Sequence, residues 1–277
     1  MSATPEHIAL ASQFQMVIHQ RQKRGQNGYV LGRGAGSSTD YLDHRRYVLG
    51  DDIRRLDWKA YARTDQLLIK RYQEEIRPAV EIWYDDSASM TLSPAKGQLV
   101  IDTVGFLAQI CRNDGIEARI FRLSQGVVAF EEILLTQEEF SSQLPLQEMV
   151  LNTIPRSRKD AHVFLISDFL SPHDPHQLVS ALSRKAATLT AIQILAKEDY
   201  HFEEEQSLLL EDAETGELIA LDLDLQTIEA YLESLQTLQD DWERLVTGWG
   251  GVFRSFSAAD SFLENCQRLV QAGVLAL

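Results

Sequence analysis

Three oxygen-bearing side chains, Asp85, Ser87 and Ser89, occupy alternate positions of the stretch EIWYDDSASM at residues 81–90. Side chains at alternate positions of an extended or loosely turning segment point to the same side, so these three can converge on one point. A carboxylate and two hydroxyls are hard ligands, which suit Mg²⁺ or Mn²⁺ better than Zn²⁺. The same residue types also cap backbone N–H groups where a strand turns into a helix. The stretch alone therefore predicts either a divalent-cation site or a capped turn.

A further carboxylate, Asp168, follows the strongly apolar stretch AHVFLIS at residues 161–167. The residues before Asp85 are also β-branched or aromatic, so both stretches are predicted to be buried strands. Ligand sites of open α/β sheets lie beyond the carboxyl ends of the strands, at the switch point of the topology. We therefore expect Asp85 and Asp168 to face each other across that switch point.

The elements that position these residues alternate between strands and helices. Ser93-Pro94 predicts the start of a helix that runs to about Asn113, because serine is favoured as N-cap and proline at the first helical position. Further strands are predicted at 117–123, 127–134, 161–167, 189–195 and 252–256, and further helices after Thr136, Ser171, Asp224 and Ser257. This order predicts an α/β fold built on a doubly wound, mostly parallel sheet.

We predict two regions, residues 1–77 and residues 78–277. The first contains a helix over Glu6–Arg24 and a dense Arg/Asp/Trp-rich segment. The second contains the sheet, with a β-hairpin insertion at 207–222 that is available to pack with the N-terminal segment.

The charge of the chain is unevenly placed. The net charge of −15 argues against general nucleic-acid binding, which requires a basic face. Residues 19–77, however, contain 13 Lys/Arg and 8 Asp/Glu, a net charge of +5, which leaves −20 for the rest of the chain. Such asymmetry predicts a basic segment that docks on an acidic body or offers its surface to an acidic partner.

Within this basic segment, residues 40–72 interleave acids and arginines with tyrosines and a tryptophan. Arginine makes bidentate pairs with carboxylates and stacks on aromatic rings. Two interpretations stay open: an internal network of ion pairs and stacking, or an exposed arginine surface that binds an acidic partner. The candidate partner-binding residues are Arg46, Asp51, Asp52, Arg54, Arg55, Asp57, Trp58 and Arg63.

Two sets of motifs carry a resemblance to known families. Asp85-x-Ser87-x-Ser89 with the later Ser167-Asp168 resembles the metal-ion-dependent adhesion site (MIDAS) of von Willebrand factor A domains. The chain is also similar to the domain of unknown function 58 family, through Arg46-Tyr47-x-x-Gly50-Asp51-Asp52-x-Arg54-x-x-Asp57-Trp58-x-x-x-Ala62-Arg63 and Leu210-x-Asp212-x-Glu214-Thr215-Gly216-Glu217. These motifs span most of the chain.

The resemblance implies a bacterial cytoplasmic protein with a von Willebrand A-like fold that acts with a MoxR-type AAA+ ATPase in the maturation or regulation of other proteins. It assigns a metal to Asp85, Ser87, Ser89 and Asp168. The adhesion-site pattern also includes a threonine from a loop between the two strands. Thr136 is the candidate, although it also begins the capping-box pattern Thr136-x-x-Glu139, and Thr153 is a weaker one.

The leading functional hypothesis is a non-catalytic protein-interaction module. Mg²⁺ or Mn²⁺ at the site would bind an acidic residue of a partner at an open coordination position. One alternative is a metal-dependent phosphoryl-transfer hydrolase with Asp85 as nucleophile. Against it, the position two residues later is Ser87 rather than a general acid, and no lysine is clearly placed to neutralise a phosphate. The other alternative is binding of an acidic partner by the arginine surface.

Other features predict no further site. No signal peptide and no membrane-spanning run is visible, and the two cysteines have no metal-ligand spacing, which favours a cytoplasmic location. Gly32-x-Gly34-x-Gly36 lacks the Lys-Ser/Thr of a phosphate loop. His173 and His176 are expected to be solvated loop residues.

Overall fold

The computed structural model describes residues 2–18, 40–73, 79–135, 140–202, 206–211 and 218–277. The chain divides into two compact units, Met1–Arg21 with Pro78–Leu277 and, separately, Gln22–Arg77. Each unit is described by itself. In the described part of the chain, no helix has both the length and the apolar character needed to cross a membrane.

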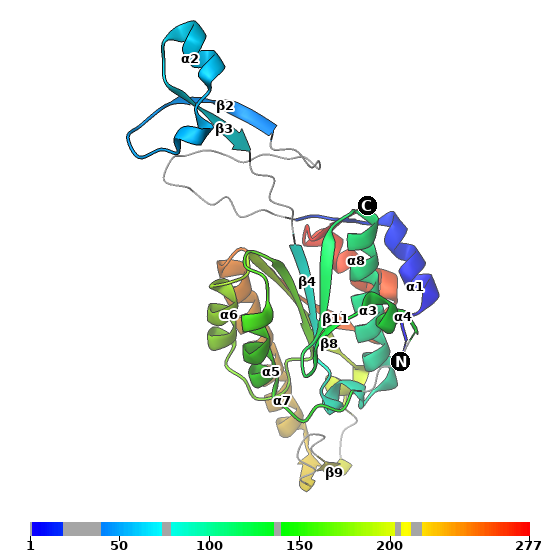
Figure 1. The fold of residues 1–277 in the computed structure, drawn as a ribbon. Coiled ribbons are helices and arrows are strands. Elements are labelled where there is room, and N and C mark those ends of the chain that lie inside the picture. The colour runs from blue at the N-terminus through cyan, green and yellow to red at the C-terminus, as the bar shows by residue number, and fades with distance from the viewer. Residues whose placement is uncertain (1, 19–39, 74–78, 136–139, 203–205, 212–217) are drawn as a thin grey trace. The chain divides into compact units, whose positions relative to one another are not determined.

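The larger unit is built on a six-stranded sheet flanked by helices (Figure 1). Its strands, in spatial order, are β11 (Val252–Ser257), β8 (Thr188–Leu195), β7 (His162–Ser167), β4 (Ala79–Tyr84), β5 (Glu117–Arg122) and β6 (Gly126–Val128). All neighbours pair in parallel except β6, which is antiparallel to β5. The predicted α/β fold with a mostly parallel sheet is confirmed, and it is compatible with a Rossmann-like fold.

The strand order contains one switch point. From β4 the chain moves to β5 on one side and then returns to β7 on the other side. The crevice at the carboxyl ends of β4 and β7 is therefore where an open α/β sheet of this topology places a ligand.

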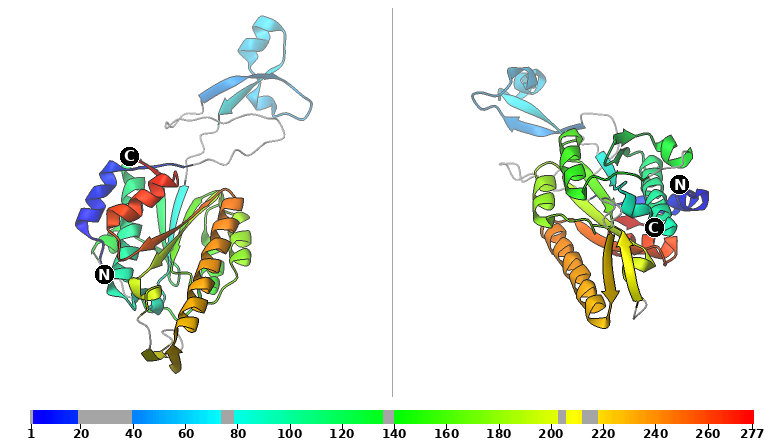
Figure 2. Two further views of the ribbon diagram at one scale, coloured as in Figure 1. Left: turned by 180° about the vertical axis from the view of Figure 1, so that it is seen from behind. Right: turned by 90° about the horizontal axis from the view of Figure 1, so that it is seen from below.

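Helices cover both faces of the sheet, as Figure 2 shows. On one face lie α1 (Pro5–Leu10), α3 (Pro94–Asn113), α4 (Phe130–Leu135) and α8 (Phe262–Gln271). The other face carries α5 (Leu146–Thr153), α6 (Pro175–Ser183) and α7 (Leu225–Gly248). Every residue of β7 and β8 is buried, which explains why their sequences read as continuous apolar runs.

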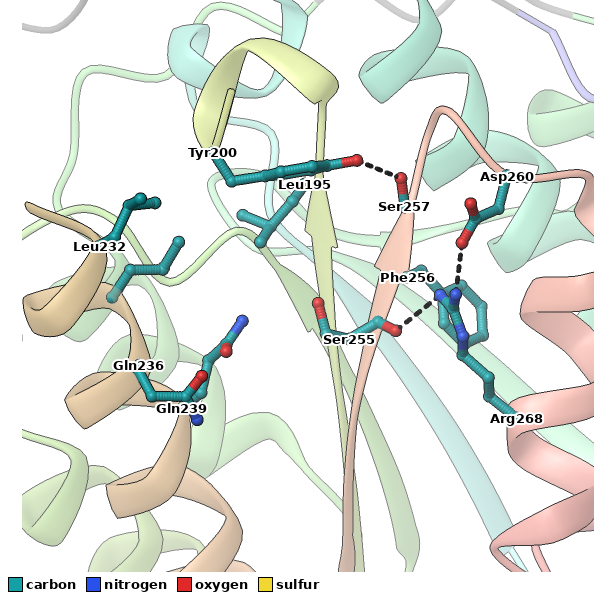
Figure 3. A pocket seen from close by; sticks show the side chains of 11 residues that line it. Leu195, Tyr200, Leu232, Gln236, Gln239, Ser255, Phe256, Ser257, Asp260 and Arg268 are labelled. Carbon is teal, nitrogen blue, oxygen red and sulfur yellow. Dashed lines mark hydrogen bonds and ion pairs between the residues drawn. The ribbon is translucent and has the colours of Figure 1, made fainter. Parts of the chain in front are cut away.

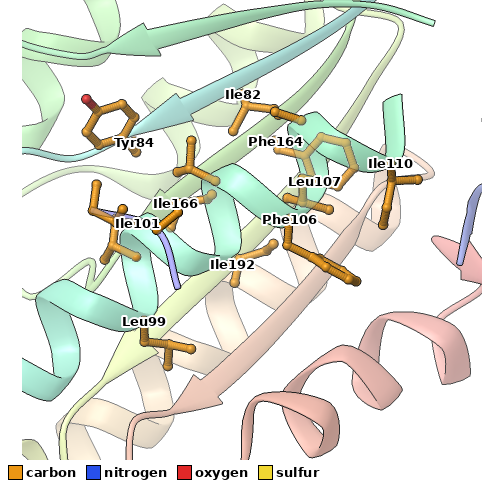
Figure 4. Packing of buried hydrophobic residues seen from close by; sticks show 14 of the residues in the cluster. Ile82, Tyr84, Leu99, Ile101, Phe106, Leu107, Ile110, Phe164, Ile166 and Ile192 are labelled. Atoms are coloured by element: carbon orange, nitrogen blue, oxygen red, sulfur yellow. The ribbon is translucent and has the colours of Figure 1, made fainter. Parts of the chain in front are cut away.

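Alternate residues of the central strands enter two separate hydrophobic cores. Ile82 and Tyr84 pack with α3, as do Phe164 and Ile166 of β7 (Figure 4). Trp83 points to the opposite face, into the core that contains Trp242 of α7. This alternation fixes the register of β4, because a shift by one residue would exchange the two faces.

The N-terminal segment is shorter in helix than predicted. The helix expected over Glu6–Arg24 ends at Leu10, and the short 3-10 helix η1 (Ala11–Gln13) and strand β1 (Gln15–Met16) follow it. β1 pairs with β12 (Leu275–Ala276) at the other end of the chain. The prediction was wrong because this pairing is non-local, and residues 19–24 lie outside the described part.

Two further boundaries differ from the prediction. The strand expected at 127–134 is only β6 (Gly126–Val128), and α4 (Phe130–Leu135) follows, with Glu131 and Glu132 favouring its N-terminal turn. The helix predicted after Thr136 begins, within the described residues, at Leu146, after Pro145, which disfavours helical backbone in the residue before it. The predicted hairpin is formed by β9 (Gln206–Glu211) and β10 (Leu218–Leu223), and its turn lies outside the described residues.

The smaller unit contains the antiparallel strands β2 (Asp40–Arg46) and β3 (Leu68–Gln73), with the 3-10 helix η2 (Ile53–Arg55) and helix α2 (Trp58–Thr64) between them. Asp57 is the N-cap of α2 and accepts hydrogen bonds from the backbone N–H groups of Lys59 and Ala60, at 2.9 and 3.1 Å. Its other oxygen lies 2.7 Å from Nε2 of His44. This buried carboxylate therefore links the helix to β2.

Candidate functional site

The switch point places Asp85 and Asp168 at the ends of neighbouring strands. Asp85 follows β4, Asp168 follows β7, and each is only 2% exposed. The backbone N–H of Asp85 donates to the carbonyl of Ile166 at 2.9 Å, so the pairing of the two strands extends to this residue. The two strand ends meet as the sequence predicts.

The Asp85 loop brings its polar side chains together. Oδ1 of Asp85 accepts a hydrogen bond from the Ser87 backbone N–H at 2.9 Å, and Oδ2 accepts one from the Ser167 hydroxyl at 2.7 Å. The hydroxyls of Ser87 and Ser89 lie 3.0 Å apart. Burial, together with the negative charge of Asp168, raises the pKa of Asp85 to about 6. Asp85 forms no ion pair among the described residues, so its charge is balanced only by hydrogen bonds.

Asp168, in contrast, is bound to a lysine. The ammonium of Lys96, in the first turn of α3, lies 2.7 Å from Oδ2 of Asp168 and 3.1 Å from Oδ2 of Asp199. The side chains of Lys96 and Asp168 are each 2% exposed. Burial lowers the pKa of Lys96, but the charges of Asp168 and Asp199 outweigh that effect and raise it above its usual value. Lys96 is therefore a buried cation at the site.

Lys96 was not among the residues predicted for this site, and its position does not contradict the prediction that no lysine is placed to neutralise a phosphate. The lysine does not face a substrate phosphate, because its charge is already shared between two carboxylates. A signal was present in the sequence: Lys96 lies four and eight residues before Val100 and Val104, which form the buried face of α3. A lysine in phase with such a face is either buried and paired or misplaced.

The backbone after β7 is unusual at Phe169, which has a φ of 58°. This left-handed conformation is costly for a bulky residue and persists only where the surroundings impose it. Here the N–H groups of Phe169 and Leu170 bond the side chains of Ser167 and Asp168, both at 3.0 Å. The centroid of the Phe169 ring lies 4.4 Å from that of the Trp242 ring, in the core that also contains Trp83. The strained turn thus keeps Asp168 at the edge of the sheet while Phe169 is buried.

Asp86, next to Asp85, has a separate role. Its carboxylate accepts a hydrogen bond from Nε of Arg122 at 2.8 Å and bonds both the backbone N–H and the hydroxyl of Ser124. It therefore holds the turn between β5 and β6 against the end of β4. The backbone of Asp86 accepts a further bond from Ser142, and Ser142 accepts one from Ala88, both at 3.1 Å. The loop around Ser142 consequently borders the Asp85 loop.

Of the two threonines considered as metal ligands, Thr153 lies in the described part of the chain. Thr153 lies buried in α5, where its hydroxyl donates to the carbonyl of Met149 at 2.9 Å. This bond satisfies the buried hydroxyl without a metal. Thr136 lies outside the described residues.

The site fits a divalent cation in part. Asp85, Ser87 and Ser89 present hard oxygens from one loop, and Asp85 carries an unneutralised charge, as the donor set of Mg²⁺ or Mn²⁺ requires. Asp168 fits less well, because its charge is already neutralised by the ammonium of Lys96 at 2.7 Å. Among the described residues, no group of three or more His, Cys, Asp or Glu side chains could hold a metal ion. A cation here would therefore depend on the serine hydroxyls.

A pocket of about 550 Å³ lies beside the site, between α7 and the ends of β8 and β11 (Figure 3). Its polar side chains bond each other: Tyr200 with Ser257 at 2.9 Å, and Arg268 with Asp260. Gln239 of the pocket wall donates to Gln193 at 2.7 Å, and Gln193 in turn donates to the Asp168 carbonyl at 2.9 Å. The pocket wall thus supports the β7 end of the site.

His173 is not the solvated loop residue that was predicted, whereas His176 is exposed. Nδ1 of His173 lies 2.7 Å from the Ser171 carbonyl, and Nε2 accepts a hydrogen bond from the Trp242 indole at 2.9 Å. Both contacts suit the neutral ring with the proton on Nδ1. Burial lowers the pKa of His173 below its ordinary value of 6.5.

We expect His173 to make the protein less stable in acid. Between the lowered pKa of the folded chain and the usual value near 6.5, the unfolded chain binds the proton more readily, so the free energy of unfolding falls as the pH falls through this interval. His173→Gln keeps an acceptor for Trp242 but cannot take up the proton. Urea unfolding between about pH 7.5 and pH 5 should show a smaller fall in the free energy of unfolding for His173→Gln than for wild type. Parallel profiles would contradict this role.

The smaller unit separates its acidic candidates from its basic ones. Asp51 forms an ion pair with Arg45 at 2.5 Å, Asp52 accepts a hydrogen bond from the Arg54 N–H, and Asp57 caps α2. The basic and aromatic candidates whose side chains are described are exposed: Arg46, Arg54, Trp58 and Arg63. The side chain of Arg55 lies outside the description. The acids are therefore used internally and the described basic side chains face outward, whereas binding of an acidic partner stays a prediction.

The comparisons with known proteins identify relatives of this chain. Residues 43–125 and 135–240 match the family described as "Protein of unknown function DUF58". Uncharacterized proteins from Mycobacterium bovis and Mycobacterium tuberculosis are each 21% identical over 284 residues, covering 96% of this chain and 89% of the relative. An aerotolerance-related membrane protein from Bacteroides fragilis aligns at a TM-score of 0.37 and 12% identity, over 70% of this chain and 99% of that one. The conserved hypothetical protein BatB from Bacteroides thetaiotaomicron aligns at 0.36 and 10% identity, over 71% and 97%.

Proposed function

The chain belongs to the DUF58 family, and we propose that it is a non-catalytic protein-interaction module with a von Willebrand A-like sheet. In this proposal, Asp85, Ser87 and Ser89 hold Mg²⁺ or Mn²⁺ at the switch point, and the cation binds a carboxylate of a partner protein. The supporting observation is Asp85 itself: a carboxylate that is 2% exposed, without an ion pair among the described residues, beside two hydroxyls 3.0 Å apart. When bound, the cation would supply coordination positions that an outside oxygen can fill.

The rim of the site suits a protein surface. Leu92, which follows the 3-10 helix η3 (Ala88–Thr91) of the Asp85 loop, is 72% exposed. Leu144, two residues after Ser142, is 40% exposed. Apolar side chains around a polar centre are the usual composition of a protein interface. They would add contact area to the carboxylate held at the centre.

The residues argue against the hydrolase alternative. Position 87 is a serine, which cannot act as a general acid at neutral pH as a carboxyl could. Lys96, which pairs with Asp168, also pairs with Asp199, so its charge is already balanced by two carboxylates. These features support binding rather than turnover.

A second surface is supported by a separate observation. In the smaller unit, Trp58 is 63% exposed and the Arg54 side chain is 90% exposed. Tryptophan and arginine are the residue types most enriched at the energetic centres of interfaces. We propose that this surface contacts an acidic face of a partner, and a MoxR-type AAA+ ATPase is the first partner to test. The two surfaces are separate proposals, because substitutions can change one surface and leave the other intact.

Binding of a purified MoxR-type AAA+ ATPase in Mg²⁺ and in EDTA tests the proposal at Asp85. We expect wild type to bind at least about ten-fold more tightly in Mg²⁺, because the cation links the two carboxylates, and Asp85→Asn to lose this difference. Asp240→Asn makes the same chemical change on the exposed side of α7 and should behave as wild type. Equal affinity of wild type in Mg²⁺ and EDTA, or an Asp85→Asn variant that keeps the difference, would refute the metal-bridged interaction.

A further inference from the structure

Lys96 occupies a position that is unfavourable for a lysine in two respects. Its side chain is 2% exposed, and burying an ammonium is costly unless it is paired and hydrogen-bonded. It also lies in the first turn of α3, where the helix dipole disfavours a positive charge. Asp168 and Asp199 compensate for both effects, at 2.7 and 3.1 Å. An apolar residue would fill the same space at lower cost, so the charge of Lys96 calls for an explanation.

The ammonium joins elements that are distant in sequence. Asp168 follows β7, and Asp199 belongs to the 3-10 helix η5 (Lys197–Asp199) after β8. The carbonyl of Asp199 accepts a hydrogen bond from the Tyr231 hydroxyl of α7 at 2.9 Å. Lys96 thus binds two carboxylates at this edge of the sheet, as a bound cation could. In the described part of the chain, Asp85 is the member of this carboxylate cluster that Lys96 does not reach.

We infer that Lys96 is a built-in cation that keeps Asp168 and Asp199 from binding a divalent ion, so that metal is held firmly only when a partner contributes a carboxylate. This inference rests on the proposed metal site at Asp85. Asp85, Asp168 and Asp199 with Lys96 carry a formal charge of −2, and the ammonium is hydrogen-bonded to Oδ2 of Asp168, which would otherwise be available to a cation. A nearby positive charge also repels the incoming ion. Metal and partner would therefore bind together, each strengthening the other.

Mn²⁺ alone, titrated into the full chain and followed by electron paramagnetic resonance, tests this role. Lys96→Met keeps an unbranched side chain of similar length but removes the charge. We expect Lys96→Met to bind Mn²⁺ at least about ten-fold more tightly than wild type, because one repulsive charge is gone and one carboxylate is released. Lys96→Arg, which keeps the charge, should show no gain. In Lys96→Met/Asp168→Asn the gain should disappear, because the released carboxylate is lost.

The outcomes separate clearly. A folded Lys96→Met variant that binds Mn²⁺ no more tightly than wild type overturns the inference, as does a gain that survives the Asp168→Asn change. If Lys96→Met is unfolded in EDTA, recovery of its circular dichroism spectrum with Mn²⁺ supports the inference and failure to recover overturns it. Lys96→Met/Asp199→Asn, with one uncompensated charge fewer, provides a second folded background for the same titration. The gain is measured without a partner, so its failure is distinguishable from failure of partner capture.

Discussion

Replacing Asp168 with alanine is expected to lower the free energy of unfolding by about 3–5 kcal/mol. The substitution leaves the ammonium of Lys96 buried with Asp199 as its remaining ion-pair partner among the described residues, and that carboxylate is partly exposed. It also removes the acceptor of the Leu170 N–H in the strained turn after β7. Urea unfolding followed by tryptophan fluorescence measures the loss, since Trp83 and Trp242 are fully buried.

Two controls assign this loss to the buried charge. Asp199→Ala should cost clearly less, because Asp168 still pairs with Lys96 and the Asp199 side chain is 20% exposed. Lys96→Met/Asp168→Ala should recover a large part of the loss, because the unpaired ammonium is removed together with its partner. An Asp168→Ala variant within about 1 kcal/mol of wild type would show that the pair is not the centre of this sheet edge.

The strand ends of the site are predictable from the sequence because local signals determine them. An apolar run that ends in a carboxylate marks β4 with Asp85 and β7 with Asp168. Parallel pairing then brings the two ends together without any further information. The neighbouring carboxylate, Asp86, looks equivalent to Asp85 in the sequence. Its partner Ser124 lies 38 residues away, so the division of roles between the two becomes visible only in the fold.

Lys96 shows where reading the sequence fails. Its contact with Asp168 spans 72 residues, and no local pattern specifies which buried carboxylate a lysine meets. The N-terminal segment failed for the same reason: the apolar spacing up to Ile18 satisfies a helix locally, but pairing of β1 with β12 determines the outcome. In the smaller unit, Asp52 and Asp57 cap helices that follow them directly in the sequence. Their motif nevertheless did not reveal which charged side chains are paired within the unit and which are exposed. The sequence left open which residues pair, and where the pairing is non-local, as for β1, the predicted element type was wrong as well.

A second large effect on stability is expected at Gly251, in the connection from α7 to β11. A Cβ at this position would lie 2.2 Å from the carbonyl oxygen of Leu189 and 2.8 Å from Cγ1 of Val246. The first neighbour is backbone of β8, which β11 pairs with, so it cannot move without opening the sheet edge. We expect Gly251→Ala to lower the free energy of unfolding by about 3 kcal/mol or more, the range of severe overpacking.

Gly248→Ala is the matched control for Gly251→Ala, three residues earlier in the same connection. Its Cβ would meet no atom within 4 Å, and it lies in the last turn of α7, where alanine is favoured over glycine by up to about 1 kcal/mol. Thermal unfolding should therefore show Gly248→Ala at or above the midpoint of wild type and Gly251→Ala well below it. Equal midpoints for the two variants would mean that β11 tolerates a wider approach to β8. Because β8 carries Gln193, which holds the carbonyl of Asp168, a displaced β8 should also weaken the support of the switch-point site.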